Sequence, residues 1–122
     1  MKDAAPPATK ETPIALILPH AGYNYAGKVM AAGVATIKGA EISRIVVLGP
    51  SHNVYLQNKL CVPQSATIME TPLGATPIDT AFVEKLKALP FVASDDITEL
   101  NEHSIQMQLP MQRENEPFPS WY

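Results

Sequence analysis

Two short runs rich in apolar residues, each bounded by turn-forming residues, dominate the first half of the chain. They lie at 14–18 and 44–48 and contain several β-branched side chains. Apolar runs of this length are typical of strands that are buried on both faces of a sheet. Between them, residues 26–37 have helical spacing and small side chains on one face, which allow close packing. Strand, helix and strand in this order predict a right-handed βαβ unit with parallel strands.

The second half of the chain is expected to contain shorter strands and two more helices. The strands are expected at 60–62, 66–69 and 91–93, the turn at 71–74, and the helices at 80–89 and 103–112. Asp79 directly precedes the first of these helices, and its carboxylate is expected to cap the helix N-terminus. The whole pattern predicts the α/β fold class, with a mostly parallel sheet flanked by helices.

The composition fits a folded domain and argues against several classes of protein. Apolar residues make up 46% of the chain and charged residues 17%, which is ordinary for a globular protein. A net charge of -3 without a Lys/Arg cluster argues against nucleic-acid binding. The single cysteine, Cys61, excludes a disulfide within the chain. With no signal peptide and no apolar run that could span a bilayer, we expect a cytoplasmic protein without membrane contact.

Twelve prolines punctuate the chain and gather toward both of its ends. Proline lacks a backbone N–H and interrupts helices and central strands, so it favours irregular structure where it clusters. We therefore expect one α/β domain at 13–112, preceded by a flexible leader at 1–12 and followed by an irregular tail at 113–122.

The chain has three histidines, and two of them follow the predicted buried strands. His20 comes after the first strand and His52 after the second, at the strand ends where open α/β sheets bind ligands. Neutral imidazoles presented at such an edge are suitable ligands for a divalent metal. The alternative is that each is a loop histidine hydrogen-bonded to the backbone. The two positions taken together favour a metal site at His20 and His52.

Other side chains near the histidines are weaker candidates. His103 precedes or opens the last predicted helix, and it could be a general acid or base, or form a capping pair with Glu102. Tyr23 and Tyr25 flank the His20 loop and could bind substrate, although packing on the sheet explains them equally. Cys61 is more typical of a small core residue, so the sequence gives no obvious third metal ligand.

Four motifs along the chain resemble one family. They read PHAGYNYAG at 19–27, LGPSH at 48–52, TPLG at 71–74 followed by Asp79, and EHSIQMQLP at 102–110. Together they resemble the amino-terminal part of the Memo family, which includes AmmeMemoRadiSam system protein B, over about residues 13–112. The resemblance implies a fold like that of class III extradiol dioxygenases, with a mostly parallel sheet flanked by helices.

The resemblance also implies a function. It makes His20 and His52 ligands of a non-haem metal, with Fe(II) expected and Cu or Zn as alternatives. His103 would be the catalytic acid or base near the substrate. The family's third metal ligand lies in its carboxyl-terminal half, beyond the motifs found here. Iron-dependent redox chemistry of the dioxygenase type is the activity expected of the full-length form.

Family members are more than twice as long as this chain, so the resemblance implies a truncated domain with a partial metal site. Catalysis by this chain alone is not expected. We expect a second chain that supplies the missing half, or a homo-oligomer, and a small-molecule or peptide ligand. The alternative function is a non-catalytic scaffold module that binds a peptide or a small ligand.

Overall fold

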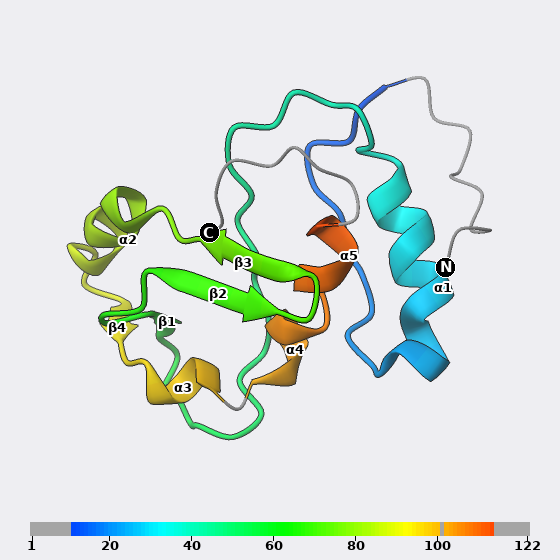
Figure 1. Ribbon diagram of the computed structural model, residues 1–122. Helices are drawn as coiled ribbons and strands as arrows, with labels where there is room; N and C mark the ends of the chain where they lie inside the picture. The colour runs from blue at the N-terminus through cyan, green and yellow to red at the C-terminus, as the bar shows by residue number, and fades with distance from the viewer. Residues whose placement is uncertain (1–10, 101, 114–122) are drawn as a thin grey trace.

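The computed structural model describes residues 11–100 and 102–113 of the chain (Figure 1). In chain order the elements are α1 (Tyr23–Ala35), β1 (Leu60–Val62), β2 (Ile68–Thr71), β3 (Gly74–Pro77), α2 (Thr80–Lys87), β4 (Val92–Ser94), α3 (Ile97–Leu100), α4 (His103–Gln106) and α5 (Leu109–Arg113). A parallel strand pair with helices makes this a small α/β domain, as expected at that level. Most of the expected leader and tail, at 1–10 and 114–122, lies outside the described residues.

The strands of the second half form close to their expected positions. β1 and β4 run parallel, with Cys61 opposite Ala93, and α2 lies in the crossover between them. β2 and β3 form an antiparallel hairpin that closes at the pair Thr71 and Gly74, which confirms the predicted turn. Val83 of α2 packs with Val62 of β1 in a small buried cluster. The amphipathic spacing predicted a helix with one buried face, and α2 does bury one face on the strands.

The strands expected at 14–18 and 44–48 do not form, so the predicted βαβ unit is wrong. Both segments lack helix and strand structure, apart from an isolated bridge at Ile45. The sheets of the described residues pair β1 with β4 and β2 with β3 and include neither segment. A strand is stable only where a neighbouring strand satisfies its backbone groups, and in the described part of the chain neither segment belongs to a ladder longer than the single bridge at Ile45.

The helix expected at 103–112 is broken into α4 and α5. Met107 and Gln108 form a turn between the two helices. Pro110 lies in the first turn of α5 and has no backbone N–H, so it cannot donate the bond that would continue α4. Proline is well tolerated in the first turn of a helix, and a second short helix therefore starts where the first one ends.

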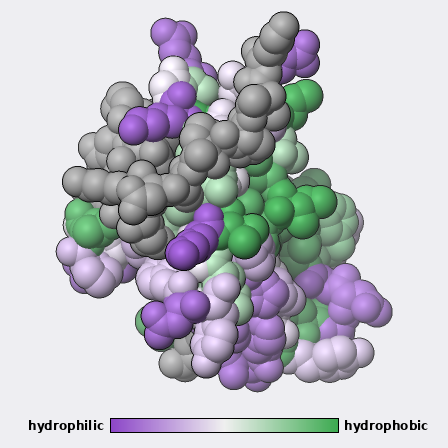
Figure 2. Space-filling view, turned by 90° about the vertical axis from the view of Figure 1, so that its right-hand side faces the viewer, coloured by the Kyte–Doolittle hydropathy of each residue, from purple (hydrophilic) through white to green (hydrophobic). Residues whose placement is uncertain are grey.

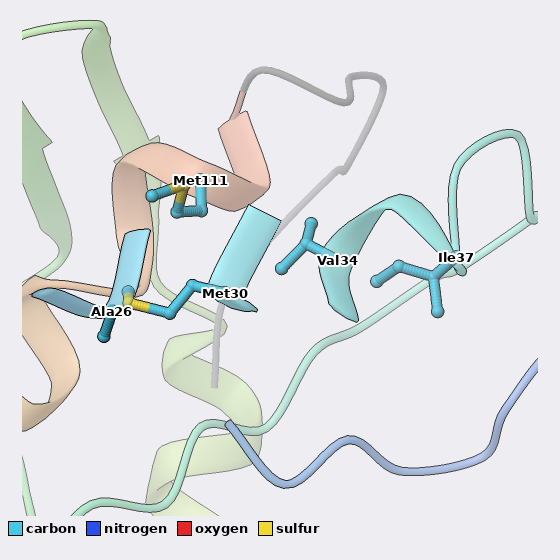
Figure 3. Packing of buried hydrophobic residues seen from close by; sticks show 5 residues of the cluster. All are labelled: Ala26, Met30, Val34, Ile37 and Met111. Atoms are coloured by element: carbon cyan, nitrogen blue, oxygen red, sulfur yellow. The ribbon is translucent and has the colours of Figure 1, made fainter. Parts of the chain in front are cut away.

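The main core lies between α1 and α5. Met30 and Val34 of α1 are fully buried, and with Met111 of α5 they belong to one cluster on the inner side of α1 (Figure 3). Leu18 packs against this cluster from the irregular segment that precedes α1. A Cβ at Gly33 would collide with the Leu18 side chain, so the small residue lets this segment lie close to α1.

Asp79 is expected to stabilise the fold through its cap on α2. Its Oδ1 accepts a 2.9 Å bond from the backbone N–H of Phe82, and Arg44 Nε donates to Oδ2 at 2.7 Å. The backbone bond from Phe82, followed by the bond from Arg44, lowers the pKa of Asp79 below its ordinary 3.8. Asp79→Ala should lower the thermal unfolding midpoint by several degrees, as measured by circular dichroism.

The depressed pKa of Asp79 sets the sign of the pH dependence. The ionised Asp79 carboxylate stabilises the fold fully at neutral pH. This stabilisation is lost as the pH falls below the ordinary carboxyl range, because the protonated form does not make the same favourable bonds. Asp79→Asn should retain part of the stability, because the amide oxygen can still accept the cap bond. Glu70→Ala, an exposed acid on β2, is the control and should change little. Equal midpoints for Asp79→Ala and the control would contradict the assignment.

Candidate metal centre

The segment that carries His20 is tied to the turn between α4 and α5. His20 lies just before α1, and Gln108 Nε2 donates to the carbonyl of Pro19 at 2.9 Å. On the other side of His20, the Tyr23 hydroxyl donates to the carbonyl of Met107 at 3.0 Å. These two bonds fix the backbone on both sides of His20, although the segment itself has no regular structure.

The loop that carries His52 is held against α4. Ser104 Oγ donates to the carbonyl of Pro50 at 2.9 Å. A Cβ at Gly49 would collide with Ser104 Oγ and lie 3.1 Å from Ile105 Cγ1. Glycine at this position therefore lets the loop approach the helix closely enough for His52 to reach the side chains at the start of α4.

The structure brings all three histidines together. Each offers one ring nitrogen to a group whose ligand atoms all lie within 4.8 Å of one another. The His52 and His103 rings stack, with centroids 4.4 Å apart, while His20 lies 5.2 Å from His52 and 5.9 Å from His103. Nitrogens that share one metal lie at most about 4.2 Å apart, since each metal–nitrogen bond is about 2.1 Å. Movements on the order of 1 Å would therefore let the three rings hold one ion.

A buried carboxylate lies behind two of the histidines. Glu102 is 3% exposed, and its Oε1 lies 2.8 Å from His52 Nδ1 and 3.7 Å from His103 Nδ1. Its Oε2 accepts a 2.6 Å bond from the backbone N–H of His52, and Oε1 accepts a 2.9 Å bond from the N–H of Ser104. A carboxylate at this position favours the proton on Nδ1 of His52, which leaves Nε2 as the nitrogen with a free lone pair.

The hydrogen bonds to Glu102 decide its charge. Burial alone would raise the pKa of this carboxyl group, but the bonds from the backbone N–H groups of His52 and Ser104, with the His52 ring, lower it to about 2. Glu102 is therefore ionised at neutral pH. A buried anion behind the rings makes the site favourable for a cation in front of them.

Glu102 lies at this site, although the sequence indicated only a capping role for it. The capping role is confirmed, because Glu102 is the N-cap of α4 and accepts from Ser104. Its bonds to His52 join residues that are 50 positions apart, which no local pattern could indicate. The sequence also left the metal site without a third ligand in this chain, whereas His103 supplies a third nitrogen to the group.

The histidine group does not include Tyr23, Tyr25 or Cys61. The Tyr23 hydroxyl is engaged with Met107, and burial raises the pKa of Tyr23. Tyr25 is exposed on α1, and its role in substrate binding stays a prediction, as does that of Tyr23. Cys61 lies on β1 outside the histidine group, with Sγ 3.9 Å from the carbonyl of Asp95.

Comparison with known proteins shows the family. The sequence matches the Memo-like protein family over residues 1–118. This chain belongs to the Memo-like family. The Memo-like chain is 40% identical over 105 residues to the MEMO1 family protein MHO1 of Saccharomyces cerevisiae, and 39% identical over 107 residues to a MEMO1 family protein of Methanocaldococcus jannaschii. No solved structure matches it.

The match covers most of this Memo-like chain but only part of its relatives. It covers 79% of the chain and 31% of the yeast protein, and 84% of the chain and 36% of the archaeal protein. The chain thus spans about a third of the length of the curated relatives that it matches. Within the described residues, no helix has the length and apolar character needed to cross a membrane.

Proposed function

We propose that this Memo-like chain binds one divalent metal ion through His20, His52 and His103. The observation that carries the proposal is the convergence of three imidazoles from separate parts of the chain, with ligand atoms within 4.8 Å of one another. A catalytic metal site usually takes three protein ligands and leaves a position open, and three histidines meet that need. Neutral imidazole suits Fe(II), Cu and Zn, and Fe(II) is the ion that we expect.

The residues around the rings support this donor set. The Glu102 carboxylate lies 2.8 Å from Nδ1 of His52, which favours the proton on Nδ1 and leaves Nε2 free to bind a metal, an arrangement common behind metal-binding histidines. The same oxygen lies 3.7 Å from Nδ1 of His103, and it would favour the equivalent orientation there. We assign Glu102 the role of positioning the two rings and of balancing the charge of the ion.

We further propose that the metal supports redox chemistry of the dioxygenase type when the rest of the Memo-like fold completes the site. Bound Fe(II) would supply open coordination positions and one-electron redox chemistry. The residues of this chain would hold and orient the ion. His103, expected from the sequence to be an acid or base, is proposed here as the third ligand because its ring nitrogen belongs to the same group. A proton-transfer role would require it to be free of the metal.

Metal titration tests the site. The wild-type chain should bind one equivalent of Zn(II), a redox-inert probe, and one of Fe(II) under anaerobic conditions. His20→Ala and His52→Ala should each weaken binding by well over about 100-fold, because removal of a ligand costs more than the loss of a group behind it. Isothermal titration calorimetry measures the affinities.

The control variants distinguish metal ligands from residues that do not bind the metal. Lys28→Ala, on the exposed side of α1, should bind metal like the wild type. Loss of affinity in His103→Ala would assign this residue as a ligand, whereas full retention would assign it the acid–base role instead. Equal uptake by the wild type, His20→Ala and His52→Ala would refute the site.

A further inference from the structure

Two segments that precede the histidines expose large apolar side chains. Ile14 and Ile17 are fully exposed, and Val46 and Leu48 are at least half exposed. The space-filling view shows apolar side chains gathered in one region on the side of the molecule where α1 lies (Figure 2). Soluble proteins rarely expose contiguous apolar surface unless it meets a partner.

Other side chains of these segments are partly buried, so the described structure covers each segment only in part. Leu16 and Leu18 pack against the α1 cluster, while Ile14 and Ile17 do not. Along residues 44–48, burial alternates between exposed and half-buried positions, which is the period of a pleated strand. The sequence there is suited to burial on both faces, and the described structure covers only one of them.

A groove of about 580 Å³ runs between the two segments. Residues 12–16 and 44–50, with Leu18 and Ile42, contribute most of its walls, and His20 and Gln108 also line it. Neither wall forms a helix or a strand, and residues 14–18 make no backbone hydrogen bond to any other described residue. Gln108 Oε1 is buried and, within the described part of the chain, has no partner. The groove therefore offers unpaired backbone groups as well as apolar side chains.

We propose that this groove binds an extended apolar strand from the part of the Memo-like fold that lies outside the match with this chain. The chain spans only 31% of the yeast relative and 36% of the archaeal relative, so most of the polypeptide of those proteins has no counterpart here. Addition of a strand would give the backbone of residues 14–18 the ladder that they lack, and would cover the exposed side chain of Ile14.

The shape of the groove favours a strand over a helix. A strand pairs with its neighbour at about 4.8 Å and satisfies backbone groups along its whole length. A helix uses its own backbone groups internally and is about 10 Å wide, so it could cover side chains but could not pair with the walls. The N–H groups of an inserted strand are also suitable donors to Gln108 Oε1.

Peptide binding tests the proposal without metal. Synthetic peptides of about 15 residues, long enough for a typical strand with its flanks, would tile the part of the Methanocaldococcus jannaschii relative outside its match to this chain. We expect one or a few apolar peptides to bind the full 122-residue chain, as measured by fluorescence polarisation. The chemical shift changes should be confined to residues 14–18 and 44–48 and their neighbours.

Charged substitutions in the groove provide the matched comparison. Ile14→Lys and Val46→Lys, at two positions that line the groove, should each weaken peptide binding by about tenfold or more, since they place a charge against the strand. Both residues are exposed, so the fold should tolerate the changes. Val29→Lys, at an exposed position of α1 away from the groove, should bind like the wild type.

Three results would overturn the proposal. They are the absence of binding by every peptide, binding that the groove variants leave unchanged, and shift changes outside the groove. Concentration-dependent dimerisation in sedimentation experiments that Ile14→Lys abolishes would also overturn it, because the groove would then bind a second copy of this chain.

Discussion

Replacing Glu102 with alanine is expected to weaken metal binding by about 10- to 100-fold and to destabilise the folded chain. Glu102 accepts bonds from the ring and backbone N–H of His52 and from the N–H of Ser104. The variant removes all of these acceptors at a position that is 3% exposed, where water cannot readily replace them. The His52 ring would then be free to rotate and to change tautomer.

Glu102→Gln separates charge from hydrogen bonding. The amide oxygen can accept only part of what the two carboxylate oxygens accept, and it carries no charge, so metal affinity should fall between those of Glu102→Ala and the wild type. Glu84→Gln on α2 is the matched control, because Glu84 is an exposed acid paired with Lys87. It should leave metal affinity unchanged.

A readout without metal distinguishes a positioning role from a merely structural one. Nitrogen chemical shifts of the histidine rings should show His52 with its proton on Nδ1 in the wild type, and a mixture of tautomers in Glu102→Ala. Circular dichroism would confirm that the variant remains folded. A folded Glu102→Ala chain with an unchanged tautomer and unchanged metal affinity would falsify the role assigned to Glu102.

Replacing Met30 with alanine is expected to cost about 2–5 kcal/mol of the free energy of unfolding. Met30 is fully buried in the cluster that joins α1 to α5. Truncation would leave a cavity next to Val34 and Met111, and the small described core offers few side chains that could fill it. Urea unfolding, followed by circular dichroism, measures the loss.

Val29→Ala is the control for Met30→Ala. Val29 is the preceding residue of the same helix, but it is largely exposed, so the change should stay within about 0.5 kcal/mol. Similar losses in the two variants would mean that the α1–α5 cluster contributes little to stability.

Sequence patterns over a few residues predicted the helices, the helix cap and the turn that form from neighbouring residues. Helical spacing gave α1 and α2, and the position of Asp79 gave the cap that the structure confirms. The turn residues at 71–74 gave the β2–β3 hairpin. In each case the backbone and cap bonds that define the element join residues close together in the sequence, so the local pattern is enough to indicate it.

Patterns failed where the cause lies far away in the chain. The apolar runs at 14–18 and 44–48 have the composition of buried strands, but a strand also needs a partner, and the described chain does not supply one. The histidine cluster was anticipated for His20 and His52 from the ends of those expected strands. The position of His103 in the same group, and of Glu102 behind it, follows from the docking of α4 against the loop at 49–52.

The three imidazoles belong to distant stretches of polypeptide, and only the native arrangement places them together. An ion that they bind would have little affinity for the unfolded ensemble, so metal uptake and folding are thermodynamically linked. At a free ion concentration of about 100 times Kd, mass action would add about 2.7 kcal/mol to the stability of the native state. Availability of the ion would then govern how much of this small domain is folded, as well as what it can do.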